Sequence, residues 1–491
     1  MFFGGNQLNV MDVRPVMLVI GVLLSGLGAA MMLPMLADLI AGSKDWRAFA
    51  TGGGLSMFLG GGLALANWGH GKRLTVRTAF LLVSLTWVLL AAFGAIPFVI
   101  SDLGLSVTDA FFESTSGLTT TGATILTGLD DMPPGVLLWR SILQWMGGIG
   151  IIVTALAVLP MLRVGGMQLF RLESSDKSEK ILPRATQIAA FIGGIYIALT
   201  MACAISYWAT GMSLFDAVCH AMTTIATGGF STSDRSMGAF MTGGADIVGT
   251  IFMFAGGVPF VLYMMAARGR PDAFLTDSQV RVYLGIFLTV TLILTFYLWL
   301  AEIHQPVRGV RLAAFNAVSI MTGTGYATAD YALWGGFANA FFFCLMFIGG
   351  CAGSTSCSIK IFRYQIAFLA LKTYVLEMAR PNVVARLKYN GRVVPEDTIF
   401  SVLSFFFLFF LCFAALAIFL SAIGLDLVTA LSGAATSVAN VGPGLGTIIG
   451  PAGTFQPLPD AAKWAMAAGM FVGRLEVVTV LVLLSPAYWR G

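Results

Sequence analysis

Apolar stretches of about 20 residues recur along nearly the whole chain and are separated by short polar segments. A helix of about that length crosses the hydrocarbon core of a bilayer. The pattern predicts ten spanning helices, near residues 14–41, 48–68, 76–100, 136–162, 185–210, 244–267, 281–302, 335–379, 397–424 and 461–487. The chain is therefore predicted to be an all-α polytopic membrane protein with no soluble domain of appreciable length.

The composition agrees with lipid as the solvent and excludes several classes of protein. Of the 491 residues, 57% are hydrophobic and only 11% are charged, whereas a soluble domain carries about 25% charged residues. The net charge of +4 is spread over loops and does not indicate nucleic acid. The six cysteines and three histidines show no metal-ligand or disulfide spacing. No convergent catalytic groups and no nucleotide-binding motif are apparent, so neither an enzyme nor an organic cofactor is predicted.

Basic residues gather in every second loop. They are Lys72, Arg73 and Arg77, then Arg171, Lys177, Lys180 and Arg184, then Arg268, Arg270 and Arg281, then Arg380, Arg386, Lys388 and Arg392. The bias of Lys and Arg towards cytoplasmic loops places these loops, and with ten spans both termini, in the cytoplasm. The opposite loops are rich in acids, which favour cations at an outer mouth.

Four of the outward connections contain a helical stretch too short to span, followed by a turn rich in Gly and Thr. A length of about 10–14 residues is typical of a re-entrant segment. The four are Asp109–Thr124, Asp216–Ser231, Leu312–Ala327 and Thr429–Gly444. Aligned without gaps, each has a glycine at its fourteenth position, namely Gly122, Gly229, Gly325 and Gly442. Such self-similarity predicts one unit used four times around an axis.

This arrangement suits a cation pore. Non-helical backbone at membrane depth is tolerated where protein or a water cavity surrounds it. Four such stretches on one axis present rings of carbonyls that replace the hydration shell of an ion. Glycine allows the backbone angles that such rings need, and the negative C-terminal ends of the short helices favour a cation. The simpler alternative is a set of Gly/Thr-rich turns with chance similarity, and four glycines in register favour the pore.

A second candidate feature interrupts the eighth predicted span. Phe337–Ile348 would be only about 18 Å long as a helix, and small and hydroxylated residues follow it in Gly349–Ser358. We interpret this segment as a flexible loop that gates the pathway. Its candidate residues are Gly349, Gly350, Gly353, Ser354 and the nearby Lys360. The alternative is a plain turn that ends a short span.

Arg474 lies near the middle of the apolar stretch 461–486. A charge at that depth is expected to face the bundle interior or a water-filled cavity. Glu476 is two residues away, on a different helix face, and is not an obvious partner. We interpret Arg474 as a fixed positive charge near the pore, and a structural ion pair with a neighbouring helix is the alternative. The same two interpretations apply to Lys360.

The motifs now in view resemble those of the Trk/Ktr/HKT superfamily of potassium transporters, in particular its TrkH/TrkG-type membrane subunit. They are the TTTGAT, ATGGFS, TGTGYA and ANVGPG turns, the GGCAGSTSCSIKIFR loop and GMFVGRLE. The similarity covers nearly the whole chain. It divides the chain into two N-terminal spans (1–70) and four pore units (71–165, 180–268, 278–380 with the gate loop 349–358, and 393–491).

The resemblance implies potassium uptake across the inner membrane by a homodimer with one pore in each subunit. It implies that K⁺ is coordinated by the carbonyls before the filter glycines, namely those of Thr120, Thr121, Thr227, Gly228, Gly323, Thr324, Asn440 and Val441. It also implies a cytoplasmic nucleotide-binding partner of the TrkA type. Cys351 and Cys357 depart from the small residues usual in the gate loop. A sodium- or proton-coupled secondary transporter of a monovalent cation or another small solute is the alternative function. Such folds also use broken helices around a midplane site.

Overall fold

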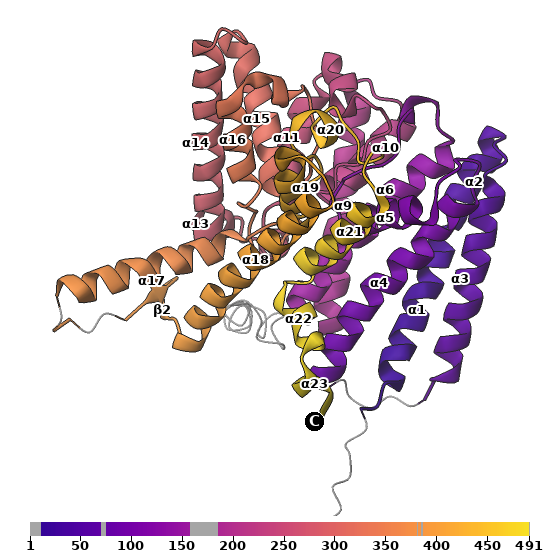
Figure 1. Cartoon of the computed structure of the whole chain (residues 1–491), viewed down its shortest axis with the longest axis horizontal. Helices are drawn as coiled ribbons and strands as arrows, with labels where there is room; N and C mark the ends of the chain where they lie inside the picture. The colour runs from indigo at the N-terminus through magenta and orange to yellow at the C-terminus, as the bar shows by residue number, and fades with distance from the viewer. Residues whose placement is uncertain (1–10, 70–74, 158–184, 381, 384–385, 491) are drawn as a thin grey trace, which may run out of the picture.

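The computed structural model describes residues 11–69, 75–157, 185–380, 382–383 and 386–490. In Figure 1 the helices form a bundle, and α17 (Ile361–Ala379) extends away from its side. Strands β1 (Lys388–Tyr389) and β2 (Arg392–Val393) form a small antiparallel hairpin, a departure from the all-α prediction. The remaining regular structure of the described residues is helical, so the predicted helical class is confirmed.

Seven helices of the described residues are long and apolar enough to span a membrane. They are α1 (Arg14–Ala30) with α2 (Met32–Ala41), α3 (Trp46–Ala66), α4 (Val76–Ile100), α6 (Pro134–Ala157), α9 (Ala185–Ala209), α14 (Ser278–Leu300) and α18 (Glu396–Ala422). Each lies within a few residues of a predicted span.

The remaining predicted spans are broken. α21 (Asp460–Arg474) and α22 (Val478–Leu484) meet at 112°. The 3₁₀ helix η2 (Ser236–Gly243) meets α11 (Ala245–Gly256) at 118°, and α12 (Phe260–Ala267) follows α11. If each bent pair counts once, the described residues contain nine spans. The predicted span 335–379 consists of α16 (Gly336–Leu345) and α17, with residues 346–360 non-helical between them.

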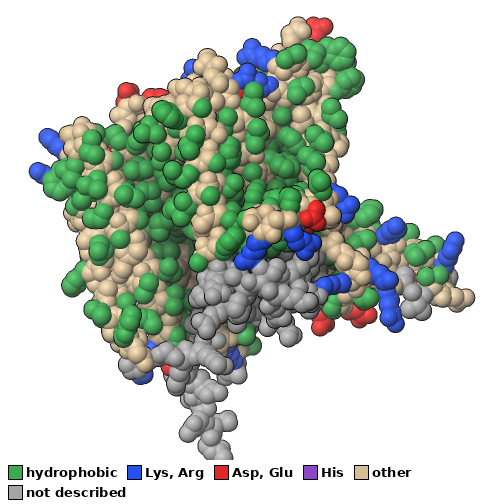
Figure 2. All heavy atoms as spheres, turned by 180° about the vertical axis from the view of Figure 1, so that it is seen from behind, with side chains coloured by type: hydrophobic (Ala, Val, Ile, Leu, Met, Phe, Trp, Pro, Cys, Tyr) green, Lys and Arg blue, Asp and Glu red, His purple; other side chains and the backbone are tan. Residues whose placement is uncertain are grey.

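The surface of the molecule suits a bilayer. Figure 2 shows a face covered broadly by hydrophobic side chains, with many Lys and Arg side chains towards its lower edge and a smaller group at the top. Large apolar side chains such as Phe58, Phe407 and Ile418 are exposed, as expected where lipid is the neighbour. Six basic residues of the predicted cytoplasmic loops, Lys72, Arg73, Arg171, Lys177, Lys180 and Arg184, lie outside the described residues.

Four short helices lie in the connections where re-entrant segments were predicted. They are α5 (Val107–Leu118), α10 (Leu214–Ile225), α15 (Pro306–Thr322) and α19 (Leu427–Ala439). Side chains of Ser106, Ser213 and Asp426 cap the first, second and fourth by accepting backbone N–H bonds. α15 begins earlier than the predicted Leu312, since Pro306 occupies the first turn, where its fixed φ and missing N–H suit a helix.

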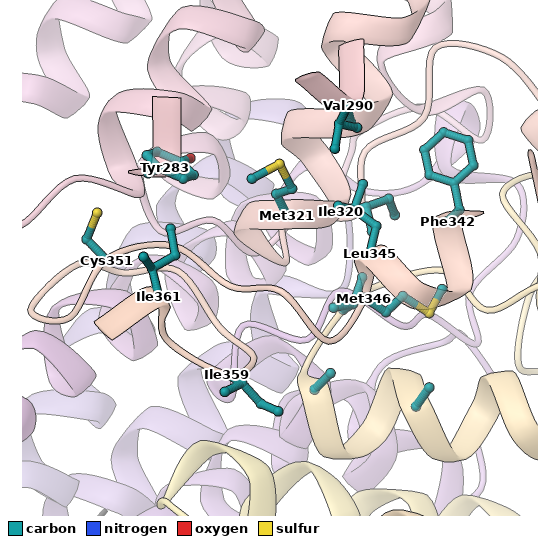
Figure 3. Packing of buried hydrophobic residues seen from close by; sticks show 14 of the residues in the cluster. Tyr283, Val290, Ile320, Met321, Phe342, Leu345, Met346, Cys351, Ile359 and Ile361 are labelled. Atoms are coloured by element: carbon teal, nitrogen blue, oxygen red, sulfur yellow. The ribbon is translucent and has the colours of Figure 1, made fainter. Parts of the chain in front are cut away.

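A buried hydrophobic cluster anchors both ends of the 346–360 segment. Figure 3 shows Met346, near one end, beside Leu345 of α16 and Ile320 of α15, and Ile359, near the other end, belongs to the same buried cluster. The ends of the segment are therefore held firmly in the core, and its middle is directed towards the short helices.

Candidate ion pathway

The four glycines predicted to mark the filter lie together in the structure. Gly122, Gly229, Gly325 and Gly442 all line one cavity of about 260 Å³. Each glycine follows the C-terminal end of one short helix by a few residues. Segments that are more than 300 residues apart in the chain therefore meet at one place.

These segments contact each other in cyclic order. A Cβ atom on Gly122 would overlap the carbonyl oxygen of Gly228, and one on Gly229 would overlap that of Thr324. A Cβ on Gly325 would lie 2.8 Å from the Cα of Gly442, and one on Gly442 would lie 3.3 Å from the carbonyl oxygen of Thr121. The contacts run from the first segment to the fourth and back to the first, so they describe a closed ring. The ring leaves little room for a side chain at its glycines.

The backbone of the four segments has a shared feature that the sequence does not display. The residue two positions before each glycine has a positive φ, with values of 54° at Thr120, 51° at Thr227, 77° at Gly323 and 52° at Asn440. A residue other than glycine rarely adopts this region, at a cost of about 1–3 kcal/mol, and holds it only where the surroundings impose it. The alignment of the four segments pairs these positions, but because they hold Thr, Thr, Gly and Asn it does not reveal their shared conformation.

Pairs of threonine hydroxyls lie within hydrogen-bond distance in the first and third of these segments. The Thr119 and Thr121 hydroxyls lie 2.8 Å apart, and those of Thr322 and Thr324 lie 2.7 Å apart. All four residues are buried. The side chains of these threonines therefore bond to one another within the wall of the ring.

A buried ion pair that the sequence analysis did not single out lies beside the larger cavity. Arg140 Nε donates to Glu113 Oε1 at 2.8 Å, and both side chains are almost completely buried. Arg140 also donates to the carbonyl of Ser231 at 2.8 Å, and Glu113 accepts from the backbone N–H of Ile125 at 3.0 Å. The pair thus holds the chain just beyond the first and second filter glycines. Its sequence signal was a basic residue inside the predicted span 136–162.

The candidate gate loop, residues 349–358, is closed at its neck. Gly349 N–H donates to the carbonyl of Ile359 at 2.9 Å, and Ile361 N–H donates to that of Gly350 at 3.1 Å. A Cβ on Gly349 would overlap the carbonyl of Cys357, and one on Gly350 would lie 2.8 Å from Ser356 Cβ. The two glycines are therefore required by close packing at this neck.

The far part of the loop bonds to the ends of three short helices. The Thr355 hydroxyl donates to Ile225 O at 2.9 Å, Cys357 N–H to Thr322 O at 3.1 Å, and Ser358 N–H to Ala439 O at 2.9 Å. The three acceptors belong to the last residues of α10, α15 and α19. The last carbonyls of a helix have no partner within it, so the loop satisfies them. It also lies where their negative dipole ends point.

Two other candidate gate residues support the loop itself. Gly353 has a φ of 73°, and its carbonyl accepts from Phe260 N–H at 3.0 Å. The Ser354 hydroxyl donates to Cys351 O at 2.6 Å. Cys351 N–H in turn donates to Gly257 O at 3.0 Å. These bonds tie the first half of the loop to the break between α11 and α12.

Arg474 faces the gate loop. Its Nη1 atom lies 2.8 Å from the Sγ atom of Cys357 and 3.4 Å from Thr355 O. The side chain is buried, and no carboxylate among the described residues forms an ion pair with it. Glu476 instead pairs with Arg363. It lies just beyond the end of α21 with a φ of 63°, so the predicted position on another face of the same helix is wrong.

A second, smaller cavity lies beside the gate-loop side of the ring. Its volume is about 30 Å³, and its lining includes Asn440, Cys357, Lys360 and Arg474. Lys360 Nζ donates to the carbonyl of Ser356 within the loop. The structure therefore brings the candidate gate residues together on one side of the ring, with the larger cavity on the other side. No group of three or more His, Cys, Asp or Glu that could hold a metal ion occurs in the described part of the chain.

Spanning helices, re-entrant segments that meet in a ring, and a cavity at each end of that ring define a helical membrane transport protein. The chain belongs to the TrkH family, described as a cation transport protein, which it matches over residues 46–490. The family predicted from the motifs is confirmed. A family of transporters also confirms the prediction that the chain is not an enzyme.

Relatives are similar over nearly their whole length. The chain is 46% identical over 482 residues to the Trk system potassium uptake protein TrkI of Halomonas elongata, covering 97% of each. It is 38% identical over 485 residues to the Trk system potassium uptake protein TrkH of Escherichia coli K12, covering 98% of this chain and 100% of that one. The crystal structure of the potassium transporter TrkH from Vibrio parahaemolyticus matches with a TM-score of 0.90 at 35% identity, over 98% of this chain and 100% of that chain.

Proposed function

We propose that this protein takes up potassium across the cell membrane through a pore formed by its four filter segments. The observation that carries the proposal is the closed ring of Gly122, Gly229, Gly325 and Gly442, with a cavity at each end. The relatives, which are potassium uptake proteins by name, support the same ion.

The selectivity filter consists of two rings of backbone carbonyls. One ring comes from Thr121, Gly228, Thr324 and Val441, and the other from Thr120, Thr227, Gly323 and Asn440. Rings of carbonyls replace the hydration shell of a monovalent cation. The shared left-handed residues support this assignment, because all four segments have a positive φ at the equivalent position.

Residues 349–358 form the gate, together with Lys360 and Arg474. The loop donates hydrogen bonds to the last carbonyls of three pore helices. Without the loop, these carbonyls would favour a cation in the space below the filter. The charge of Arg474 opposes cation entry into the same space. We interpret this arrangement as closed, so the loop must move away from the helix ends before ions pass.

The wider architecture follows the division predicted from the motifs. Ten spans comprise two N-terminal spans (1–70) and four helix–pore–helix units (71–165, 180–268, 278–380 and 393–491). The protein is a homodimer in the lipid of the inner membrane, with both termini cytoplasmic. A cytoplasmic nucleotide-binding subunit of the TrkA type regulates it, as the resemblance implies. A regulatory nucleotide would act through that subunit, because the sequence contains no nucleotide-binding motif of its own. Potassium is its cargo, and no organic cofactor is assigned to this chain.

The first test is growth of a potassium-uptake-deficient bacterium at low K⁺, with the regulatory partner co-expressed. Ion flux into liposomes that contain the purified protein should then show preference for K⁺ over Na⁺. The alternative function is tested by imposing a proton or sodium gradient across the same liposomes. Accumulation of K⁺ against its own gradient would favour a coupled transporter, and downhill flux alone supports the pore. Absence of any K⁺ flux from folded protein with its partner would overturn the proposal.

A further inference from the structure

The Gln144 side chain, on α6, bonds to the second filter segment on both sides of Gly229. Its Nε2 atom donates to the carbonyl oxygen of Gly228 at 2.7 Å, and its Oε1 atom accepts from Phe230 N–H at 3.0 Å. Gln144 is fully buried. A Cβ on Gly228 would overlap the Gln144 amide, so the glycine and the amide are in close contact. Both polar atoms of the Gln144 amide therefore bond to the backbone of the second filter segment.

This contact makes the four carbonyls of one filter ring inequivalent. Gly228 O accepts a hydrogen bond from the Gln144 side-chain amide. The three equivalent carbonyls, of Thr121, Thr324 and Val441, accept no hydrogen bond from the described residues. In the neighbouring ring, the closest donor contact is that of Cys357 Sγ with Thr120 O, at 3.9 Å. Of the four carbonyls in this ring, Gly228 O is thus the one that accepts a hydrogen bond from a side-chain amide in the described part of the chain.

We propose that Gln144 is a positioning residue that sets the preference of the pore for K⁺ over Na⁺. The inference rests on the proposed function, because it requires Gly228 O to belong to the filter. Selectivity in a carbonyl filter depends on cavity size and on the number and field strength of the carbonyl dipoles. Na⁺ is the smaller ion and needs the oxygens to move inward. The amide of Gln144 holds Gly228 O at a fixed radius and takes up one of its two lone pairs.

The second bond of Gln144 prevents the amide from following the carbonyl. Phe230 N–H, on the far side of Gly229, fixes Oε1, so the side chain cannot rotate while keeping both contacts. Gly122 of the first segment is also packed against Gly228 O, since a Cβ on Gly122 would overlap that oxygen. The carbonyl is therefore restrained between two segments of the wall. Loss of the Gln144 donor leaves one of these two restraints.

Two variants separate the two bonds. Gln144→Met keeps a similar length and removes both hydrogen bonds. Gln144→Glu keeps an acceptor for Phe230 N–H, and in its ionised form, which is favoured by measuring at high pH, it cannot donate to Gly228 O. The matched control is Ser141→Ala on the same helix, because the buried Ser141 hydroxyl donates to Leu137 O at 3.0 Å and does not bond to the filter.

The measurement is the ratio of K⁺ to Na⁺ flux into liposomes that contain each full-length variant. We expect the ratio to fall about tenfold in both Gln144 variants, which corresponds to about 1.4 kcal/mol of lost discrimination, and to stay unchanged in Ser141→Ala. A merely structural role would lower folding yield or total flux without changing the ratio. The second readout is thermal stabilisation of the purified variants by K⁺ and by Na⁺, which reports ion binding without transport.

The outcomes distinguish this inference from the proposed function. If the wild type conducts K⁺ selectively and both Gln144 variants keep its ratio, Gln144 does not set selectivity while the filter assignment stands. If the ratio falls in Gln144→Met and not in Gln144→Glu, the bond to Phe230 is responsible and the inference is wrong. An equal fall in Ser141→Ala would also overturn it, because packing of α6 would then be the cause. If the wild type itself conducts no K⁺, the proposed function fails. If Gln144→Met does not fold, Gln144→Glu decides.

Discussion

The side-chain amide of Asn440 donates to the hydroxyl oxygen of Thr121 at 2.9 Å, although the two residues are 319 positions apart in the chain. The same amide donates to the carbonyl of Met470 on α21 at 2.9 Å. Asn440 therefore joins the fourth filter segment to the first and to the helix that carries Arg474. The ring closes here through a side chain.

Replacing Asn440 tests this closure. Asn440 has a φ of 52°, a region that Asn tolerates better than most residues. Asn440→Gly keeps the conformation and removes the amide, whereas Asn440→Ala removes the amide and adds backbone strain. We expect Asn440→Gly to lower thermal stability by about 1–3 kcal/mol, the cost of a buried unsatisfied group, and Asn440→Ala to lower it further. Thermal unfolding of the purified variants measures both effects. Equal stability of all three proteins would show that the amide contributes nothing to closure.

The first filter glycine should tolerate no side chain. Gly122→Ser would place a Cβ against Gly228 O at a φ of 85°, so we expect loss of the K⁺ over Na⁺ preference in liposome flux. The matched control is Gly128→Ser in the same connection. Gly128 also has a positive φ, of 75°, but a Cβ there meets nothing within 4 Å. An unchanged preference in Gly122→Ser would remove this residue from the filter.

The glycines and the re-entrant segments could be predicted because a steric requirement limits which residue type can occupy a position, and that limit is visible in the sequence. Gly122, Gly229, Gly325 and Gly442 lie where neighbouring backbone leaves little or no room for a Cβ, and only one residue type meets that condition. The interruption after Phe337–Ile348 was visible for a similar reason, since an apolar stretch that is too short cannot span.

The rest of the site depends on tertiary contacts that leave no local pattern. Thr120, Thr227 and Asn440 share a left-handed backbone because packing imposes it, with no common residue type. The gate loop donates hydrogen bonds to Ile225 O and Thr322 O. These acceptors are backbone atoms, so the pattern of side chains in the sequence does not predict their positions. The bends of 118° between η2 and α11 and of 112° between α21 and α22 were also not visible in the sequence.

The Glu113–Arg140 pair offers a test by a double-mutant cycle. Both side chains are almost completely buried, so removal of one partner leaves an unpaired charge. Glu113→Gln or Arg140→Met alone should destabilise the protein by about 3–5 kcal/mol. The double variant should cost much less than the sum of the two, because the two residues interact directly. Additive losses in thermal unfolding would show that the pair is not a unit.

Neutralising Arg474 should increase basal ion flux. Arg474→Gln removes the positive charge beside the gate loop, and the side chain has no carboxylate partner among the described residues to be left unpaired. We expect faster K⁺ flux in liposomes without the regulatory partner. Arg281→Gln, an exposed residue on α14, is the control for loss of a positive charge. Flux at the wild-type level in Arg474→Gln would contradict a role for Arg474 in gating.

Cys357 should report access to the gate from solution. Its sulfur lies 3.4 Å from the Thr120 hydroxyl and 2.8 Å from Arg474 Nη1, and its residue lines the small cavity below the filter. The reagent is a methanethiosulfonate, added while the regulatory partner holds the pore open. Reaction with this thiol adds bulk to a space of about 30 Å³, so we expect K⁺ flux to fall several-fold. Cys357→Ser should abolish the effect. Cys351→Ser should retain it, because Cys351 is buried at the other end of the loop and does not line that cavity. Inhibition that persists in Cys357→Ser would place the reactive thiol elsewhere and remove the loop from the ion path at this position.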